Sequence, residues 1–144
     1  MRRFSEVGQQ VSKIRRQFRD HPDVLAVRWV VAANTHQWAQ ALSLAKDICR
    51  LAPDKPSGWS YQASSLIELK RCAEAYEILQ DGHRRFPDDE MIAYDLGCVC
   101  CCLSRQEEAF SWIRKAIDLG GFQVERRAIA DPELLAMWTK VGIR

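Results

Sequence analysis

The residues best suited to chemistry are cysteines that crowd into one short segment, residues 98–102. Cys98 and Cys101 have C-x-x-C spacing, and on a helix Cys98, Cys101 and Cys102 share one face. Thiolates in that arrangement can bind zinc or another soft metal. However, the sequence offers no fourth ligand and no second C-x-x-C, and redox C-x-x-C motifs adjoin a βαβ unit that is not predicted here. We therefore favour packed, free thiols, with a metal or redox protein as the alternative.

Other catalytic patterns are missing from the sequence. It contains no G-x-G-x-x-G, P-loop, G-x-S-x-G or H-E-x-x-H motif. The three histidines, His21, His36 and His83, lie far apart, and the first two fall at predicted turns. We therefore expect no enzyme activity, no cofactor, and neither catalytic nor metal-binding residues.

Composition predicts a single domain, residues 1–144. Apolar residues make up 47% of the chain, enough for a packed core, and charged residues make up 28%. No apolar run approaches the roughly 18 residues of a membrane helix, and no signal peptide is recognised at the start. We expect a cytoplasmic protein that does not enter a membrane and whose six cysteines stay reduced.

Charge is unevenly distributed along the chain. Residues 1–22 carry a net charge of +4, whereas the whole chain carries +2. A basic segment of this kind could steer an acidic partner or a nucleic acid. Few aromatic residues interleave its arginines, so we do not expect nucleic-acid binding and interpret the segment as a solvated helix face.

A repeat of 34 residues organises the middle of the chain. Ala41, Ala75 and Ala109 begin similar apolar segments at that spacing, and Pro53, Pro87 and Gly121 follow the same period. This is the length of a tetratricopeptide repeat, whose pattern runs W-x2-L-G-x2-Y, then A-x3-F, then P. The second repeat has Trp59-x2-Gln62-Ala63-x2-Leu66, and the third has Leu96-Gly97-x2-Cys100.

Over residues 22–121 the chain therefore resembles the tetratricopeptide repeat (TPR) family, as a bacterial three-repeat protein with capping helices at both ends. The resemblance implies an all-α fold: a right-handed α-α superhelix, or solenoid, of antiparallel helix pairs. It places repeats at 22–55, 56–89 and 90–121. Small residues such as Ala63 and Gly97 would let the two helices of a pair approach closely.

The first repeat departs from this pattern. Pro22 lies 19 residues before Ala41, whereas the corresponding spacing in the other two repeats is 22. We expect three residues to be missing from the turn before its first helix. This alignment places Trp29 where a small residue is expected, whereas a slipped register would place Ala32 there.

Helices are predicted near 4–19, 23–34, 37–51, 56–69, 72–85, 89–102, 106–119 and 132–141, with a single turn at 124–130. Residues 1–21 form an N-terminal helix and residues 122–144 a C-terminal cap, in which Asp131 and Pro132 start the last helix. The N-terminal helix has an apolar stripe that we expect to cover the open face of the first repeat. Dimerisation through this helix is the alternative. The stripe contains Phe4, Val7, Val11, Ile14 and Phe18.

The family resemblance also implies a binding surface, because the first helices of tetratricopeptide pairs line a concave groove. Its lining here is small and mostly uncharged, which suits an amphipathic helix or an extended peptide. Family members that grip an acidic C-terminus use lysines and asparagines, and Asn34 is the only such residue nearby. The lining residues are Ala26, Val30, Ala33, Ser57, Ser60, Ser64, Ile67, Met91, Tyr94, Cys98, Cys101 and Cys102.

The predicted function is thus a protein–protein interaction module, an adaptor or chaperone-like binder of a protein or peptide segment. One alternative is a secretion chaperone that shields an apolar exported subunit. Another interpretation of the groove is that small residues only permit tight curvature and that binding occurs elsewhere.

Overall fold

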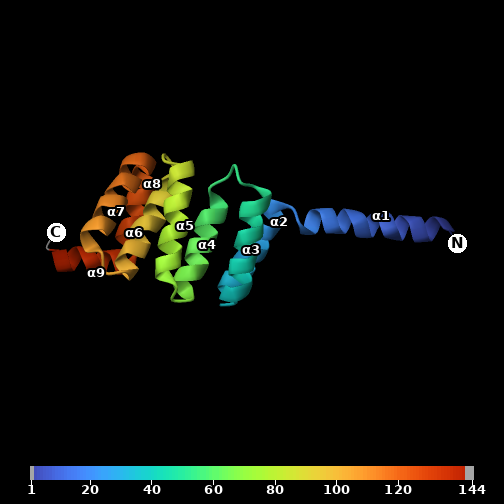
Figure 1. Ribbon diagram of the computed structural model, residues 1–144, viewed down its shortest axis with the longest axis horizontal. Helices are drawn as coiled ribbons and strands as arrows, with labels where there is room; N and C mark the ends of the chain where they lie inside the picture. The colour runs from blue at the N-terminus through green and yellow to red at the C-terminus, as the bar shows by residue number, and fades with distance from the viewer. Residues whose placement is uncertain (1, 142–144) are drawn as a thin grey trace.

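Helices and short connections build the described part of the chain, residues 2–141 of the computed structural model (Figure 1). Within these residues there are nine helices and no strand, so the all-α prediction is confirmed. None of the described helices is both long and apolar enough to cross a membrane. The helices are α1 (Arg2–Arg19), α2 (Pro22–Asn34), α3 (Trp38–Leu51), α4 (Ser57–Glu68), α5 (Cys72–Arg85), α6 (Glu90–Cys102), α7 (Gln106–Gly120), α8 (Phe122–Ala130) and α9 (Pro132–Val141).

Three helix pairs, α2–α3, α4–α5 and α6–α7, stack side by side (Figure 1). Each pair is joined by a turn in which one non-glycine residue has positive φ: His36 at 57°, Lys70 at 62° and Ser104 at 59°. The next amide reaches back to close each first helix, as Arg71 N does to Leu66 O at 2.8 Å. These three turns are 34 residues apart, which confirms the predicted repeat period.

The turns also settle the register of the first repeat. With His36 matched to Lys70, Trp29 corresponds to Ala63, and Pro22 corresponds to Pro56 rather than to Pro53. Pro22 lies in the first turn of α2, so the expectation that residues are missing there is wrong. Helix α2 is complete, and Pro22 begins this helix and does not end an earlier helix.

Small residues allow the close approach within each pair. Ala41, Ala75 and Ala109 are all 0% exposed. A Cβ atom on Gly97 of α6 would lie closer to Ile113 Cδ1 of α7 than carbon atoms normally come. The prediction that Gly97 serves close helix packing is therefore confirmed.

The N-terminal helix does not cover the first repeat. Figure 1 shows α1 extending away from the stacked pairs along the long axis of the molecule, and Phe18 is 65% exposed. The other four residues of the predicted stripe have side chains outside the described part of the structure. Val27 and Val31 of α2 are 65% and 58% exposed, and none of the helices within residues 2–141 covers them.

The C-terminal segment packs against the last pair. Residues 122–130 form the helix α8 instead of the predicted single turn. Asp131 caps α9 as predicted, because its Oδ1 accepts a hydrogen bond from Glu133 N at 3.0 Å. Leu134 and Met137 are buried against α6, whereas Leu135 is 48% exposed.

Candidate functional site

The first helices of successive pairs form one continuous surface. Trp29 of α2 stacks on Tyr61 of α4, with ring centroids 4.4 Å apart. Next along the stack, α4 contacts α6. The guanidinium of Arg127 on α8 lies over the Tyr94 ring of α6, 4.9 Å from its centroid. The four helices α2, α4, α6 and α8 therefore lie in one layer, as the repeat resemblance implies.

Most of the predicted groove residues are accessible on this layer. On α4 the partly exposed residues are Ser57, Ser60, Ser64 and Ile67, and three of the predicted residues on α6 are partly exposed too. On α2, Ala26 and Ala33 are partly exposed and Val30 is 45% exposed. A partly exposed side chain at each position leaves a row that another molecule can contact. On α6 these accessible residues are Met91, Cys98 and Cys101.

A pocket brings part of this set together where α4 and α6 end. It has a volume of about 390 Å³, and Ile67, Cys101 and Cys102 share its wall with Met137 of α9. The Sγ atom of Cys101 lies 3.4 Å from Met137 Sδ. Polar and charged side chains line it as well, among them Glu68, Glu133 and Lys70.

Tyr94 does not line the groove as predicted. It is only 3% exposed, and its hydroxyl donates a hydrogen bond to Asp131 Oδ2 at 2.9 Å. Burial is the main cause that raises the pKa of Tyr94 well above its ordinary value. Tyr94 therefore lies beneath the surface and links α6 to the start of α9.

Cys102 also departs from the prediction of free thiols. It forms a disulfide with Cys72, at the start of α5, with a Cα–Cα distance of 6.5 Å. The antiparallel arrangement of α5 and α6 brings these two ends together across 30 residues of sequence, and no spacing motif signalled the pair. Among the described residues Cys49, Cys98, Cys100 and Cys101 are free.

The remaining thiols of the cluster are poorly suited to metal or redox chemistry. Burial is the main cause that raises the pKa of Cys100 to about 12 and that of Cys101 to about 11. Burial also raises the pKa of Cys98. These thiols stay protonated near neutral pH, whereas metal ligation and disulfide exchange require thiolates. In residues 2–141 no group of three or more His, Cys, Asp or Glu side chains is placed to hold a metal ion.

Two residues that the sequence reasoning missed also belong to this surface. Tyr61 is partly exposed beside Ser60 and Ser64. Asp95 lies on α6 four residues after Met91 and three before Cys98, and it is also partly exposed. The same helical spacing that selected Met91 and Cys98 selects Asp95 too, so the signal was present in the sequence.

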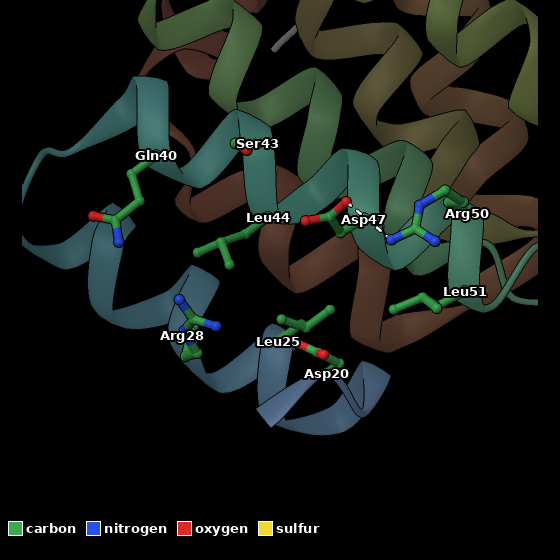
Figure 2. A pocket seen from close by; sticks show the side chains of 9 residues that line it. All are labelled: Asp20, Leu25, Arg28, Gln40, Ser43, Leu44, Asp47, Arg50 and Leu51. Carbon is green, nitrogen blue, oxygen red and sulfur yellow. Dashed lines mark hydrogen bonds and ion pairs between the residues drawn. The ribbon is translucent and has the colours of Figure 1, made fainter. Parts of the chain in front are cut away.

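A second pocket lies away from this surface, between α2 and α3 (Figure 2). Its volume is about 350 Å³. Leu25 and Leu44 line it together with polar groups, and Arg50 is paired there with Asp47 at 3.3 Å (Figure 2). This pocket lies at the N-terminal end of the stack and includes none of the predicted groove residues.

The architecture is that of a tetratricopeptide repeat domain: paired helices with a 34-residue period and a continuous layer of first helices. No family model matches the chain, and no curated protein matches it. Solved structures do match. The TPR domain of Sgt2 from Aspergillus fumigatus has a TM-score of 0.71 and 18% identity, covering 84% of this chain and 79% of that one.

Two further solved structures are described by what they bind. The first TPR of Spaghetti (RPAP3), bound to the HSP90 peptide SRMEEVD, has a TM-score of 0.67 and 16% identity, covering 84% of this chain and 93% of that one. YrrB, described as a TPR protein with an unusual peptide-binding site, has a TM-score of 0.60 and 13% identity, covering 99% and 76%. At sequence identities this low, the structural similarity establishes the fold alone.

Proposed function

We propose that this protein is a protein–protein interaction module that binds a peptide or a helix along the surface of α4 and α6. The observation that supports this most is the row of small, uncharged, partly exposed side chains on adjacent helices, among them Ser60, Ser64 and Cys98. Small side chains leave room for a partner's larger ones, and the repeat layer holds them in fixed positions.

The two peptide-binding neighbours support a peptide as the ligand class but not the same peptide. The RPAP3 domain is bound to SRMEEVD, which is acidic. This surface has Asp95 near its middle, and Asn34 is exposed at the far end of α2. Like charges repel, so an acidic C-terminus is a poor match for this chain.

The finer role that we propose is a non-enzymatic adaptor or chaperone-like binder that acts in the cytoplasm. Disulfides are rare where thiols are kept reduced, so in the cytoplasm we expect the Cys72–Cys102 pair to be mostly reduced. Trapping thiols in intact cells with an alkylating reagent tests this: a disulfide found there would move the proposed location out of the cytoplasm. Dimerisation through α1 remains a prediction, tested by light scattering during gel filtration.

Two other functions were predicted as alternatives. A secretion chaperone would bind an apolar exported subunit, and the uncovered valines of α2 offer apolar surface for it. A thiol-based metal or redox protein is disfavoured by the raised pKa values of Cys98, Cys100 and Cys101.

The experiment that tests the proposal is photo-crosslinking to peptides selected from a displayed random library on the immobilised full chain. A photoreactive residue replaces Ser64 in one variant and Ser111 in a second. Ser111 is exposed on α7, a second helix of a pair, and serves as the matched control. We expect crosslinks from position 64 only. Equal crosslinking from both positions, or a library that yields no binder, would contradict the proposal.

A further inference from the structure

We propose that Asp95 forms a subsite for a cationic side chain, a lysine ammonium or an arginine guanidinium, on the segment that the α4–α6 surface binds. This inference rests on the proposed function and specifies the chemistry of its ligand. The proposed function depends on small side chains that leave room for a partner, whereas this inference adds a specific charged contact at Asp95.

One oxygen of the Asp95 carboxylate lacks a hydrogen-bond donor. Its Oδ2 atom is enclosed and has no hydrogen-bond partner in the described structure. The residue as a whole is nevertheless partly exposed, on the same side of α6 as Met91 and Cys98. An enclosed carboxylate oxygen without a partner is costly, and native proteins normally pair such groups with a cation or a hydrogen-bond donor.

The groups around Asp95 favour an added positive charge. From α4, the side chain of Ser60 supplies a hydrogen bond. Asp89, the N-cap residue of α6, adds a second negative charge, and the Cys98 thiol of α6 lies close by. The carboxylate of Asp131, at the start of α9, adds a further negative charge, which raises the pKa of Cys98.

Among these described neighbours, Arg127 of α8 is the one cation whose charge lowers the pKa of Asp95. It is exposed, it donates to Met91 Sδ at 3.5 Å, and its guanidinium lies over the Tyr94 ring. No ion pair joins it to Asp95 within residues 2–141. The carboxylate therefore lacks the direct partner that a ligand cation would supply.

The fold itself does not require an acid at this position. One repeat earlier, 34 residues back, the corresponding residue is Tyr61, and two repeats earlier it is Val27. Both sit in complete first helices. The repeat geometry thus tolerates an aromatic or an aliphatic side chain, and helix packing gives no reason for the carboxyl group of Asp95.

The side chains beside Asp95 on this surface are small and uncharged. Ser60 on one side and Cys98 on the other are short, and Ser64 follows one helical turn after Ser60. A lysine or arginine could lay its aliphatic stem along this row while its charged head reaches Asp95. The contact would then be a charge-assisted hydrogen bond, stronger than one between neutral groups.

Binding should also depend on pH. Burial raises the pKa of Asp95 to about 7, and the Ser60 hydrogen bond and Arg127 lower it only in part. A ligand cation favours the ionised carboxylate, so binding would release a proton. The affinity should therefore rise as the pH rises through about 7.

The test uses synthetic versions of the peptides selected on the full chain. Each lysine or arginine is replaced in turn by an uncharged residue of similar length, norleucine or citrulline. Affinity is measured by calorimetry for the natural chain, for Asp95→Asn, and for Asp118→Asn. Asp118 is exposed on α7 and provides a matched control.

We expect that replacing one particular lysine or arginine of the peptide weakens its binding about tenfold or more, both to the natural chain and to Asp118→Asn. The same replacement should not change the affinity of the peptide for Asp95→Asn. The rise in affinity with pH should also vanish in Asp95→Asn alone. Peptides that lack a cation, or a loss that persists in Asp95→Asn, would overturn the inference. Peptides that bind through Ser64 but independently of Asp95 would refute the subsite and leave the proposed function intact, whereas a lack of groove-bound peptides would refute both.

Discussion

Trp29 and Tyr61 stack with ring centroids 4.4 Å apart and an angle of 19° between the rings. The indole Nε1 of Trp29 also donates to Ser65 Oγ at 3.1 Å. Together these contacts join α2 to α4, across the boundary between two repeats. In a stacked array each repeat is stabilised mainly by its neighbours, so this pair should be important for the first repeat.

We predict that Trp29→Ala lowers the free energy of unfolding by about 2–4 kcal/mol, because it removes both the stack and the hydrogen bond. Urea denaturation followed by circular dichroism measures this. Trp29→Phe keeps an aromatic ring for the stack and should lose only about 1 kcal/mol. An unchanged midpoint for Trp29→Ala would show that the first repeat is held by other contacts.

A matched pair of substitutions in α5 tests the helix-pair packing. Ala75 is 0% exposed, whereas Ala73, two residues earlier, is exposed. Ala75→Leu should cost about 1–3 kcal/mol by overpacking, and Ala109→Leu in α7 should behave alike. Ala73→Leu should leave the melting temperature nearly unchanged. Equal effects at positions 73 and 75 would be inconsistent with the repeat alignment.

Much of the fold could be predicted from the sequence because it follows from local patterns. The 34-residue period, the small residues such as Gly97, and the Asp131 cap are all visible in the sequence. The turns were harder to place because Lys70 and Ser104 adopt positive φ, where glycine is the usual residue.

Other features depend on tertiary arrangement. An apolar stripe shows that a helix has a face to bury but does not name its partner, so the position of α1 could not be predicted. The Cys72–Cys102 pairing depends on how two helix ends meet in space. Asp95 shares a face with Met91, but its unpaired oxygen becomes evident only when the neighbouring helices are in place.

The disulfide yields a further prediction. Under oxidising conditions the intact mass of the protein should show one disulfide, and peptide mapping should assign it to Cys72 and Cys102. Removing it by a double Ser substitution should lower stability by about 2–4 kcal/mol, since the bond closes a loop of 30 residues. A reductant should lower the melting temperature of the natural chain but not of this variant. Six free thiols in the oxidised protein would contradict the pairing.

The stability of the free protein should depend on the ionisation of Asp95. Its pKa rises from 3.8 in its ordinary state to about 7 in the fold, mainly because the carboxyl group is enclosed and loses contact with water. Its neutral form therefore contributes stability that is fully present below about pH 4 and is lost as the pH rises through about 7. Relative to the natural chain, Asp95→Asn should become more stable as the pH rises from 4 to 8. Thermal melts across this range measure the difference, and Asp118→Asn should show none of it. A constant difference between Asp95→Asn and the natural chain would mean that the carboxyl group is well solvated.

The central claim is that a protein segment binds along α4 and α6. It is tested most directly by calorimetric titration of a selected peptide into Ser64→Arg and Ser111→Arg, two identical changes on a first and a second helix of a pair. Both variants should stay folded, because a long arginine can direct its head to water. We predict that Ser64→Arg loses about 2–5 kcal/mol of binding free energy, whereas Ser111→Arg binds like the natural chain. Unchanged affinity in a folded Ser64→Arg variant would contradict the account and move the binding site away from the first helices.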